Sequence, residues 1–470
     1  MTEQTIAGAA PQHAGVGGGF GKRLVLSAVG WSLLGYGSSY GLRMLSSIIM
    51  TRLLVPEMFG VMAVAMVVLT IVFMMCDVGL RQAVIRSPNG DQQIFLDTAW
   101  TVQIIRGFII WTVCALCAAF IAWGSASGWF ASASVYAAPE LPWVVMSIAL
   151  TSVILGFQST KSMTSDRHFN QRQLTVIELI SQSIGLVVCV AVAYATRSIW
   201  SFVAGTLVAS VITLALSHFY LKGPLNRLRI DRACLKELSH FGRWVLLSSG
   251  LTVLAANGDR VMLANAIDPR NFGFYVIALN FVLMVEGAGG RLFMSVATAS
   301  LSKIANENLQ RIRDAYYRMR LPFDVAFIGS AGILFASADA IVTVLYDDRY
   351  ADAGPILRVL SFSLILSRFG LLHSLYIAMG KPQYLGLLNA VKTAALFVLV
   401  PLCTWLFGFQ GALWAIALHG LVMLPVIYTL NRRYGLNSLG FEAAILLIWP
   451  VGYAAGLALS TILLRIHELF

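Results

Sequence analysis

The sequence predicts an all-α polytopic membrane protein, with two six-helix bundles related by an internal repeat around a central cavity and about one additional C-terminal helix. Three observations predict this fold class. First, 58% of the 470 residues are hydrophobic and only 12% are charged, whereas a soluble domain is about half apolar and a quarter charged. Second, apolar runs of membrane-spanning length recur along the chain. Third, one short motif occurs twice. This composition excludes a water-soluble fold.

The order of the elements follows from the apolar runs. Residues 1–23 are rich in Gly and Ala and end in Lys22 and Arg23, so we expect a disordered cytoplasmic tail and not a cleaved signal peptide. A span needs roughly 20 mostly apolar residues. Thirteen runs qualify, at 24–51, 59–80, 98–123, 141–160, 174–195, 199–221, 244–267, 272–302, 321–346, 355–379, 385–406, 411–431 and 441–464. They form an N-terminal bundle at 24–221, a basic cytoplasmic linker at 222–243, a C-terminal bundle at 244–431 and the additional helix at 441–464.

Lys and Arg are distributed unevenly among the connections. With the N-terminus inside, the inner connections hold 21 of them and the outer ones five, which is the bias of cytoplasmic loops. The net charge of +11 therefore belongs to short loops, and nucleic acid is not an expected partner. The inner segment 303–320 has Ile312, Tyr316 and Met319 on one face among arginines, which favours an amphipathic helix at the membrane surface. The longest outer connection, about 124–140, is too short for a catalytic domain, so we do not expect an enzyme.

The repeated motif has the form P-x-x-F-G. It occurs at Pro56–Gly60 and again at Pro269–Gly273, an offset of 213 residues, and an apolar span follows each copy. Because six is even, both halves start on the same side of the membrane, and the repeat is parallel. Paired halves of this kind place a substrate site at their interface and move against each other for alternating access. The arrangement predicts a transporter.

Three segments carry a family resemblance. Residues 51–60 (TRLLVPEMFG), 77–80 (DVGL) and 378–382 (AMGKP) resemble the polysaccharide-transporter family, which includes the Wzx-type flippases for lipid-linked oligosaccharides. That family belongs to the multidrug, oligosaccharidyl-lipid and polysaccharide flippase superfamily. The resemblance implies a V-shaped pair of six-helix bundles in the bacterial cytoplasmic (inner) membrane. The thirteenth span departs from the family's twelve or fourteen helices, so the side of the C-terminus is open.

The resemblance also implies a function. It is the translocation of a polyprenyl-diphosphate-linked oligosaccharide from the inner to the outer leaflet, for exopolysaccharide, capsule or O-antigen synthesis. The implied partners are the lipid-linked oligosaccharide, membrane lipids, and a polysaccharide polymerase with its export machinery. The alternative is a small-molecule or multidrug antiporter of the same superfamily.

Cations inside the spans are the first candidate site residues. They are Arg43, Arg106, Arg260, Arg291, Arg358, Arg368 and Lys392. A charge at the centre of a lipid-facing helix costs at least ~2.5–3.5 kcal/mol, so such side chains should face a cavity or a partner. Arg43, Arg291 and Arg368 are the deepest, and a guanidinium suits a diphosphate because it donates two parallel hydrogen bonds. Arg260 is a further candidate, with pairing to Asp259 as the alternative.

Polar residues at helical spacing accompany these cations. One stripe comprises Tyr36, Tyr40, Arg43 and Ser47, and residues so spaced lie on one helix face. Asn280 and Arg291 share a face of the eighth span, next to the Gly287–Gly290 run. We predict that these residues line a cationic substrate cavity. The alternatives are close packing through the small residues and interfacial anchoring by the tyrosines.

Acids inside the spans are candidates for ion coupling. Those expected to be buried are Asp77, Glu178, Asp259, Glu286, Asp324 and Asp339. Asp77, Glu178 and Glu286 are the candidates for a coupling cation or proton, and the alternative is that the acids neutralise the arginines. Cys114 and Cys117 lie in an apolar run without a nearby His, so we predict packing and not metal binding. No catalytic residue, metal or cofactor is expected.

Overall fold

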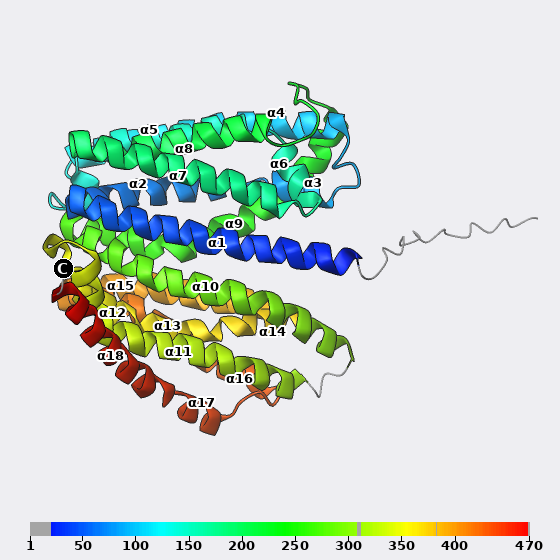
Figure 1. The fold of residues 1–470 in the computed structure, drawn as a ribbon. Coiled ribbons are helices and arrows are strands. Elements are labelled where there is room, and N and C mark those ends of the chain that lie inside the picture. Colours follow the sequence, from blue (N-terminus) through cyan, green and yellow to red (C-terminus); the bar gives the residue numbers. More distant parts are fainter. Residues whose placement is uncertain (1–19, 308–311, 382, 469–470) are drawn as a thin grey trace, which may run out of the picture.

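The computed structural model describes residues 20–307, 312–381 and 383–468, and all regular elements in these ranges are helical. The chain folds into two lobes that lie side by side, with α1 and α10 at their boundary (Figure 1). Most of the predicted tail at 1–23 lies outside the described residues.

The first lobe begins at Phe20 and ends at Phe219. Its helices are α1 (Phe20–Leu53), α2 (Pro56–Met75), α3 (Leu80–Arg86), α4 (Gln93–Ala126), η1 (Val135–Ala137), α5 (Leu141–Gly156), α6 (Lys161–Arg167), α7 (Gln171–Thr196) and α8 (Trp200–Phe219). Two short helices, α3 and α6, lie together at one end of the lobe (Figure 1). We call this the basic end, because the segment at 222–231 also lies there.

The second lobe begins where the linker ends. Its helices are α9 (Arg232–Ala266), α10 (Pro269–Glu307), α11 (Ile312–Leu345), η3 (Asp348–Tyr350), α12 (Ala353–Leu360), α13 (Phe362–Ser367), η4 (Arg368–Gly370), α14 (Leu371–Ala378), α15 (Gln383–Leu418), η5 (His419–Val422), α16 (Met423–Arg432), α17 (Leu439–Ile445) and α18 (Ile448–Glu468). Asp231 caps α9 by accepting hydrogen bonds from the backbone N–H groups of Ala233 and Cys234. Helix α9 therefore occupies the second half of the linker predicted at 222–243.

The helices agree with a membrane protein. Within the described residues, nine helical segments are long and apolar enough to cross a membrane, and a tenth counts if the bent pair α5 and α6 forms one span. One of the nine, Gln383–Arg432, is 50 residues long and changes direction at Gly408, whose φ is +62°. That segment contains two of the predicted spans. The all-α membrane fold is confirmed, whereas an exact pair of six-helix repeats stays a prediction.

One predicted element is wrong in its described part. Residues 312–320 do not form a separate surface helix, because α11 continues from Ile312 to Leu345 without a break. Ile312 and Tyr316 are 3% and 1% exposed. Their apolar face packs inside the lobe, and it is therefore not available to the membrane surface.

The additional C-terminal helix packs along α11. A Cβ at Gly332 would clash with the backbone of α18, and one at Gly452 or Gly456 with the backbone of α11. Glycines thus allow the two backbones to approach closely, which is how helices associate inside a bilayer. Helix α18 ends at Glu468 on the side of the α1–α2 turn, opposite the basic end (Figure 1).

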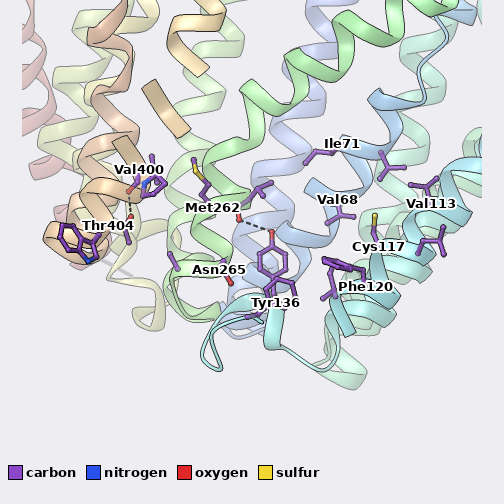
Figure 2. A pocket seen from close by; sticks show the side chains of 18 residues that line it. Val68, Ile71, Val113, Cys117, Phe120, Tyr136, Met262, Asn265, Val400 and Thr404 are labelled. Atoms are coloured by element: carbon purple, nitrogen blue, oxygen red, sulfur yellow. Dashed lines mark hydrogen bonds between the residues drawn. The ribbon is translucent and has the colours of Figure 1, made fainter. Parts of the chain in front are cut away.

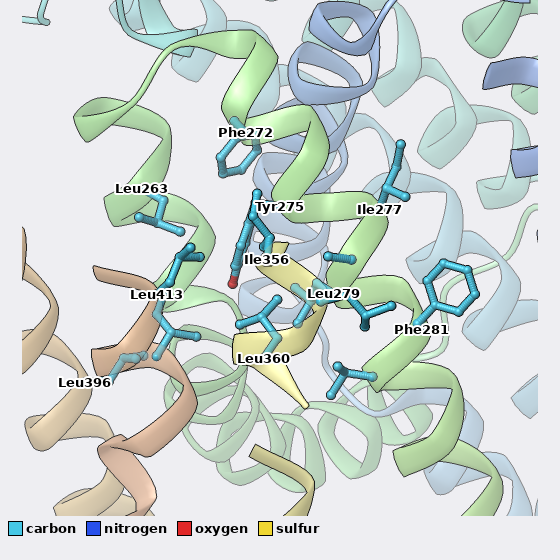
Figure 3. Packing of buried hydrophobic residues seen from close by; sticks show 14 of the residues in the cluster. Leu263, Phe272, Tyr275, Ile277, Leu279, Phe281, Ile356, Leu360, Leu396 and Leu413 are labelled. Carbon is cyan, nitrogen blue, oxygen red and sulfur yellow. The ribbon is translucent and has the colours of Figure 1, made fainter. Parts of the chain in front are cut away.

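Apolar packing extends across both lobes. In the second lobe, Leu263 of α9, Phe272 of α10, Ile356 of α12 and Leu413 of α15 converge on one cluster (Figure 3). Each of these side chains is at most 4% exposed. The cluster fixes the last turns of α9 and the first turns of α10, and both helices contact α2 of the other lobe.

Candidate functional site

The two copies of the repeated motif contact each other. A Cβ at Gly60 would clash with the carbonyl oxygen of Pro269, and a Cβ at Gly273 would clash with the carbonyl oxygen of Pro56. The contact is reciprocal, as in a pair related by a two-fold axis. Because α2 and α10 both begin at these prolines, the first turns of the two helices seal the lobes at the end opposite the basic end. We call it the closed end.

Further contacts between the lobes strengthen this seal. The Tyr350 hydroxyl donates to the Leu54 carbonyl at 2.8 Å, and Arg349 donates to the carbonyls of Thr51 and Arg52, at 3.2 Å each. Burial raises the pKa of Tyr350 above its ordinary value, so the hydroxyl remains a donor. The last turns of α1 are therefore fixed to the connection between α11 and α12.

The predicted stripe on α1 faces the second lobe. The Ser47 hydroxyl lies 3.2 Å from the hydroxyl of Tyr346, the residue that follows α11. A Cβ at Gly287 of α10 would clash with the hydroxyl of Tyr36. Tyr40 packs on Tyr36, with ring centroids 4.4 Å apart. The stripe therefore faces the other lobe, whereas its lining of a substrate cavity stays a prediction.

Arg43 and Asn280 lie at one depth on facing helices. Arg43 is seven residues from Tyr36 and Asn280 is seven residues from Gly287, both toward the closed end. Each is therefore about 10 Å from the Tyr36–Gly287 contact. Both side chains are exposed. Within the described part of the chain, no acidic side chain forms an ion pair with Arg43, whose guanidinium lies 5.7 Å from the Tyr40 ring centroid.

Two other predicted site residues, Arg291 and Arg260, are not seen next to Arg43. The side chain of Arg291 lies outside the described residues. Arg260 donates to the Asn257 side chain at 2.5 Å, while Asp259 accepts a hydrogen bond from Tyr275. Asp259 thus has a hydrogen-bond partner other than Arg260.

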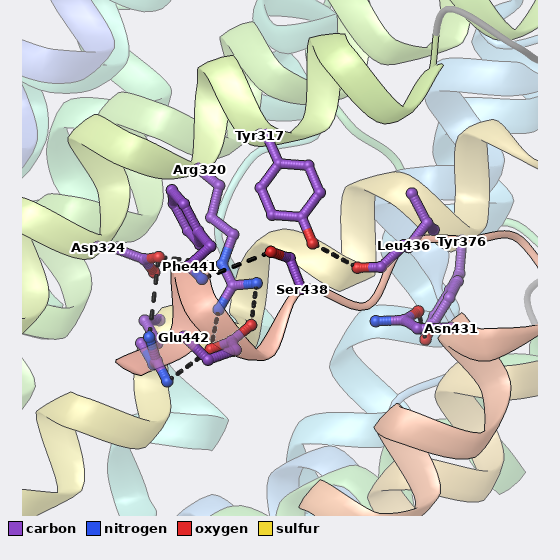
Figure 4. Close-up of polar contacts among 10 residues, drawn as sticks. Tyr317, Arg320, Asp324, Tyr376, Asn431, Leu436, Ser438, Phe441 and Glu442 are labelled. Atoms are coloured by element: carbon purple, nitrogen blue, oxygen red, sulfur yellow. Dashed lines mark hydrogen bonds and ion pairs between the residues drawn. The ribbon is translucent and has the colours of Figure 1, made fainter. Parts of the chain in front are cut away.

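Arg368 belongs to a closed ion cluster in the second lobe. Its guanidinium lies 2.9 Å from the Glu442 carboxylate and 3.8 Å from that of Asp324. Arg320 lies 3.0 Å from Asp324 and forms a two-pronged pair with Glu442, one contact being 2.7 Å (Figure 4). The side chains of Arg320 and Arg368 are 3% and 7% exposed. For Arg368, neutralisation by acids is what the structure shows, and nothing in the sequence pattern predicted Glu442 and Arg320 as its companions.

A polar cavity of about 660 Å³ lies within the first lobe. Asp77 and Glu178, two predicted coupling acids, both line it. Asp77 lies 3.4 Å from Arg106, and Glu178 accepts from Ser39 at 3.1 Å and from Gln182 at 3.0 Å. The expectation that Glu178 is buried is wrong, because its side chain is exposed where the cavity opens.

The remaining acids lie in the second lobe. Glu286 accepts a hydrogen bond from Ser367, and it is not among the residues that line the polar cavity of the first lobe. Asp339 is 53% exposed and pairs with Arg358, so the expectation of burial is wrong there too. The three predicted coupling acids do not form one site.

Comparisons with known proteins add to this geometry. The family described as "Polysaccharide biosynthesis protein" matches residues 49–353. The succinoglycan biosynthesis transport protein ExoT of Rhizobium meliloti is 24% identical over 349 residues, which cover 73% of this chain and 66% of ExoT. The lipopolysaccharide biosynthesis protein WzxC of Escherichia coli is 20% identical over 384 residues, which cover 81% of this chain and 74% of WzxC.

A solved structure of the lipid II flippase MurJ, in an inward closed conformation, has a similar fold. The TM-score is 0.62 at 14% identity, and the match covers 93% of this chain and 99% of that one. At this identity the likeness concerns the fold alone. It agrees with the two-lobed arrangement of the helices.

Proposed function

We propose, from the premise that this chain belongs to the polysaccharide biosynthesis protein family, that it is a flippase for a polyprenyl-diphosphate-linked oligosaccharide. The cargo moves from the inner to the outer leaflet for the synthesis of an exopolysaccharide, a capsule or an O-antigen. The observation that carries the proposal is the asymmetry between the two ends. The lobes are sealed by Gly60 and Gly273 at one end, and an exposed arginine, Arg43, lies below the seal on α1, which contacts α10 of the other lobe at Tyr36 and Gly287.

The proposed orientation places the N-terminus in the cytoplasm of a bacterium. The basic end then faces the cytoplasm, as the distribution of Lys and Arg favours. The closed end faces outward, so the conformation is inward-facing. Rocking of one lobe against the other would separate the two glycines and open the outer end.

The proposed headgroup site is the surface around Arg43, on the side of α1 that faces α10. The Arg43 guanidinium has no acidic partner among the described side chains, and a charge at this depth is costly without one. A diphosphate would supply that partner through two parallel hydrogen bonds. Tyr36, Tyr40 and Asn280 lie on the same two facing surfaces, where hydroxyl and amide groups suit a sugar.

The test is deletion of the gene in its host, followed by analysis of polyprenyl-linked sugars. We expect the finished oligosaccharide lipid to accumulate on the cytoplasmic side, because its synthesis continues while its translocation stops. Unchanged lipid-linked pools together with altered drug resistance would overturn the proposal.

That second outcome would favour a small-molecule antiporter, the other candidate. The polar cavity of the first lobe is the feature that favours it. Asp166 and Asp77 there are already paired with Arg81 and Arg106, which lowers their attraction for a cationic drug. The flippase proposal assigns the chain no catalytic step, and it names a polysaccharide polymerase and the export machinery as partners.

A further inference from the structure

An apolar groove of about 970 Å³ lies between the two lobes. One wall comes from α2 and α4 of the first lobe, with Val68, Val113 and Phe120 (Figure 2). The other wall comes from α9 and α15 of the second lobe, with Met262 and Val400. The Arg43 surface belongs to α1 and α10, so the groove lies between other helices of the same two lobes.

Two polar side chains of the groove have protein partners, while Asn265, one residue before the end of α9, is exposed. The Tyr136 hydroxyl donates to the Val261 carbonyl at 3.2 Å and thus joins the lobes. The Thr404 hydroxyl donates to the Val400 carbonyl at 2.6 Å. The remaining lining is almost entirely aliphatic and aromatic. A sugar or a phosphate would lose its hydrogen bonds to water here, whereas a hydrocarbon would not.

Aromatic side chains mark the level at which the groove opens. Phe120, Trp123 and Trp129 form a cluster near the closed end, with the two indole centroids 4.9 Å apart. Trp405, across the groove, is 81% exposed. Exposed aromatic residues of this kind gather at the interface between the lipid chains and the headgroups. Val113 is 13 residues before the end of α4, so it lies about 20 Å deeper in the membrane than that end of the helix. The groove therefore extends from the interface into one leaflet.

We infer that this groove holds the isoprenoid chain of the lipid-linked cargo in the leaflet at the closed end. The inference rests on the proposed function, because only a lipid-linked cargo carries such a chain. The walls belong to different lobes and separate when the lobes rock. A rigid partner would lock both walls together, while a flexible hydrocarbon chain can follow their movement. The charged headgroup would use the Arg43 surface while the chain stays in an apolar environment.

The first arm of the test fills the groove. In Val68→Trp an indole occupies the space of the chain, and we expect polymer export to fall about tenfold or more, equivalent to about 1.4 kcal/mol. Met66→Trp is the matched control, because Met66 lies two residues away on α2, is 38% exposed and does not line the groove. Membrane abundance of both variants is measured alongside. Val113→Phe, a smaller increase in volume, replaces Val68→Trp if that variant does not accumulate.

The second arm measures contact directly. A photo-crosslinking amino acid replaces Val113 in the groove or Val187 on α7, which is 67% exposed outside it. The purified full chain in vesicles is irradiated with a labelled polyprenyl diphosphate or with a labelled phospholipid. We expect the polyprenyl probe to label position 113 several times more than position 187, and the phospholipid to label both alike.

The outcomes separate the two proposals. Wild-type protein that does not move lipid-linked sugar would overturn the proposed function. If the wild type moves lipid-linked sugar but Val68→Trp exports normally, only the groove inference is overturned. The same holds if the polyprenyl probe labels position 113 no more than position 187. Equal labelling of position 113 by phospholipid and polyprenyl probe would also overturn it, since the groove would then be an ordinary lipid contact.

Discussion

The two lobes share a repeated motif but differ in how their charged side chains are placed. In the first lobe, Asp77 and Glu178 line an open polar cavity. In the second, Arg320, Arg368 and Asp324 are closed into an ion cluster that is completed by Glu442 of α17. Open charges remain available to water and ions, while closed ones fix helices in place. The repeat thus gives the lobes a common frame, and the charges give them different roles.

The largest expected effect is the loss of the closed cluster. Glu442→Ala leaves two buried guanidinium groups without their shared carboxylate, and we expect a loss of about 3 kcal/mol in unfolding free energy, the lower end for a broken buried pair. Asp77→Ala, the counterpart in the open cavity, should cost about 1 kcal/mol or less, because its pair is partly exposed. Denaturant unfolding in detergent measures both. Equal losses would contradict the distinction between the lobes.

Substitutions at the closed end test whether the two copies of the repeated motif contribute equally to stability. Gly60→Ala and Gly273→Ala each place a methyl group against a backbone carbonyl of the other lobe, and we expect similar losses of about 1–3 kcal/mol. Gly37→Ala on α1 is the control, because a Cβ there meets no atom within 4 Å. Thermal unfolding of the three variants decides. Very different losses at the two motifs would show that the contact is not reciprocal.

Arg43 should matter for export and not for stability. In Arg43→Ala we expect export to fall strongly, with a stability change within about 0.5 kcal/mol, because the side chain is exposed and unpaired among the described residues. Arg43→Lys keeps the charge but not the paired hydrogen bonds, so export should be intermediate. Normal export by Arg43→Ala would remove this residue from the proposed headgroup site.

The smallest effect belongs to an exposed pair at the closed end. The Arg349 hydrogen bonds lower the pKa of Asp347 below its ordinary value in the folded protein. The stabilisation is therefore present above the ordinary pKa of an aspartate and is lost as the pH falls through the lowered value. Asp347→Asn should cost about 0.5 kcal/mol or less at neutral pH, and nothing at a pH below both values. If the difference in unfolding temperature between the wild type and Asp347→Asn did not change with pH, this explanation would be refuted.

Two members of the ion cluster, Glu442 and Arg320, were not predicted from the sequence. Glu442 lies in the first turn of the last predicted span, and an acid there is a signal in itself. Arg320 was assigned to a surface helix because the arginines around Ile312 and Tyr316 have amphipathic spacing. Spacing along one helix shows which residues share a face, but it does not show what that face contacts.

The sequence by itself determined the membrane environment, the approximate position of most apolar helices, the repeated motif and the family resemblance, because apolar run length and local motifs depend only on neighbouring residues. The tertiary structure decided which charges meet. Arg368 and Glu442 are 74 residues apart, and their pairing depends on how α17 and α18 dock on α11. The tertiary structure also decided that the two P-x-x-F-G motifs contact each other. It leaves an apolar groove between the lobes, and the two walls of this groove are distant in the sequence. These features arise from the relative rotation and approach of helices, which packing among many residues sets together.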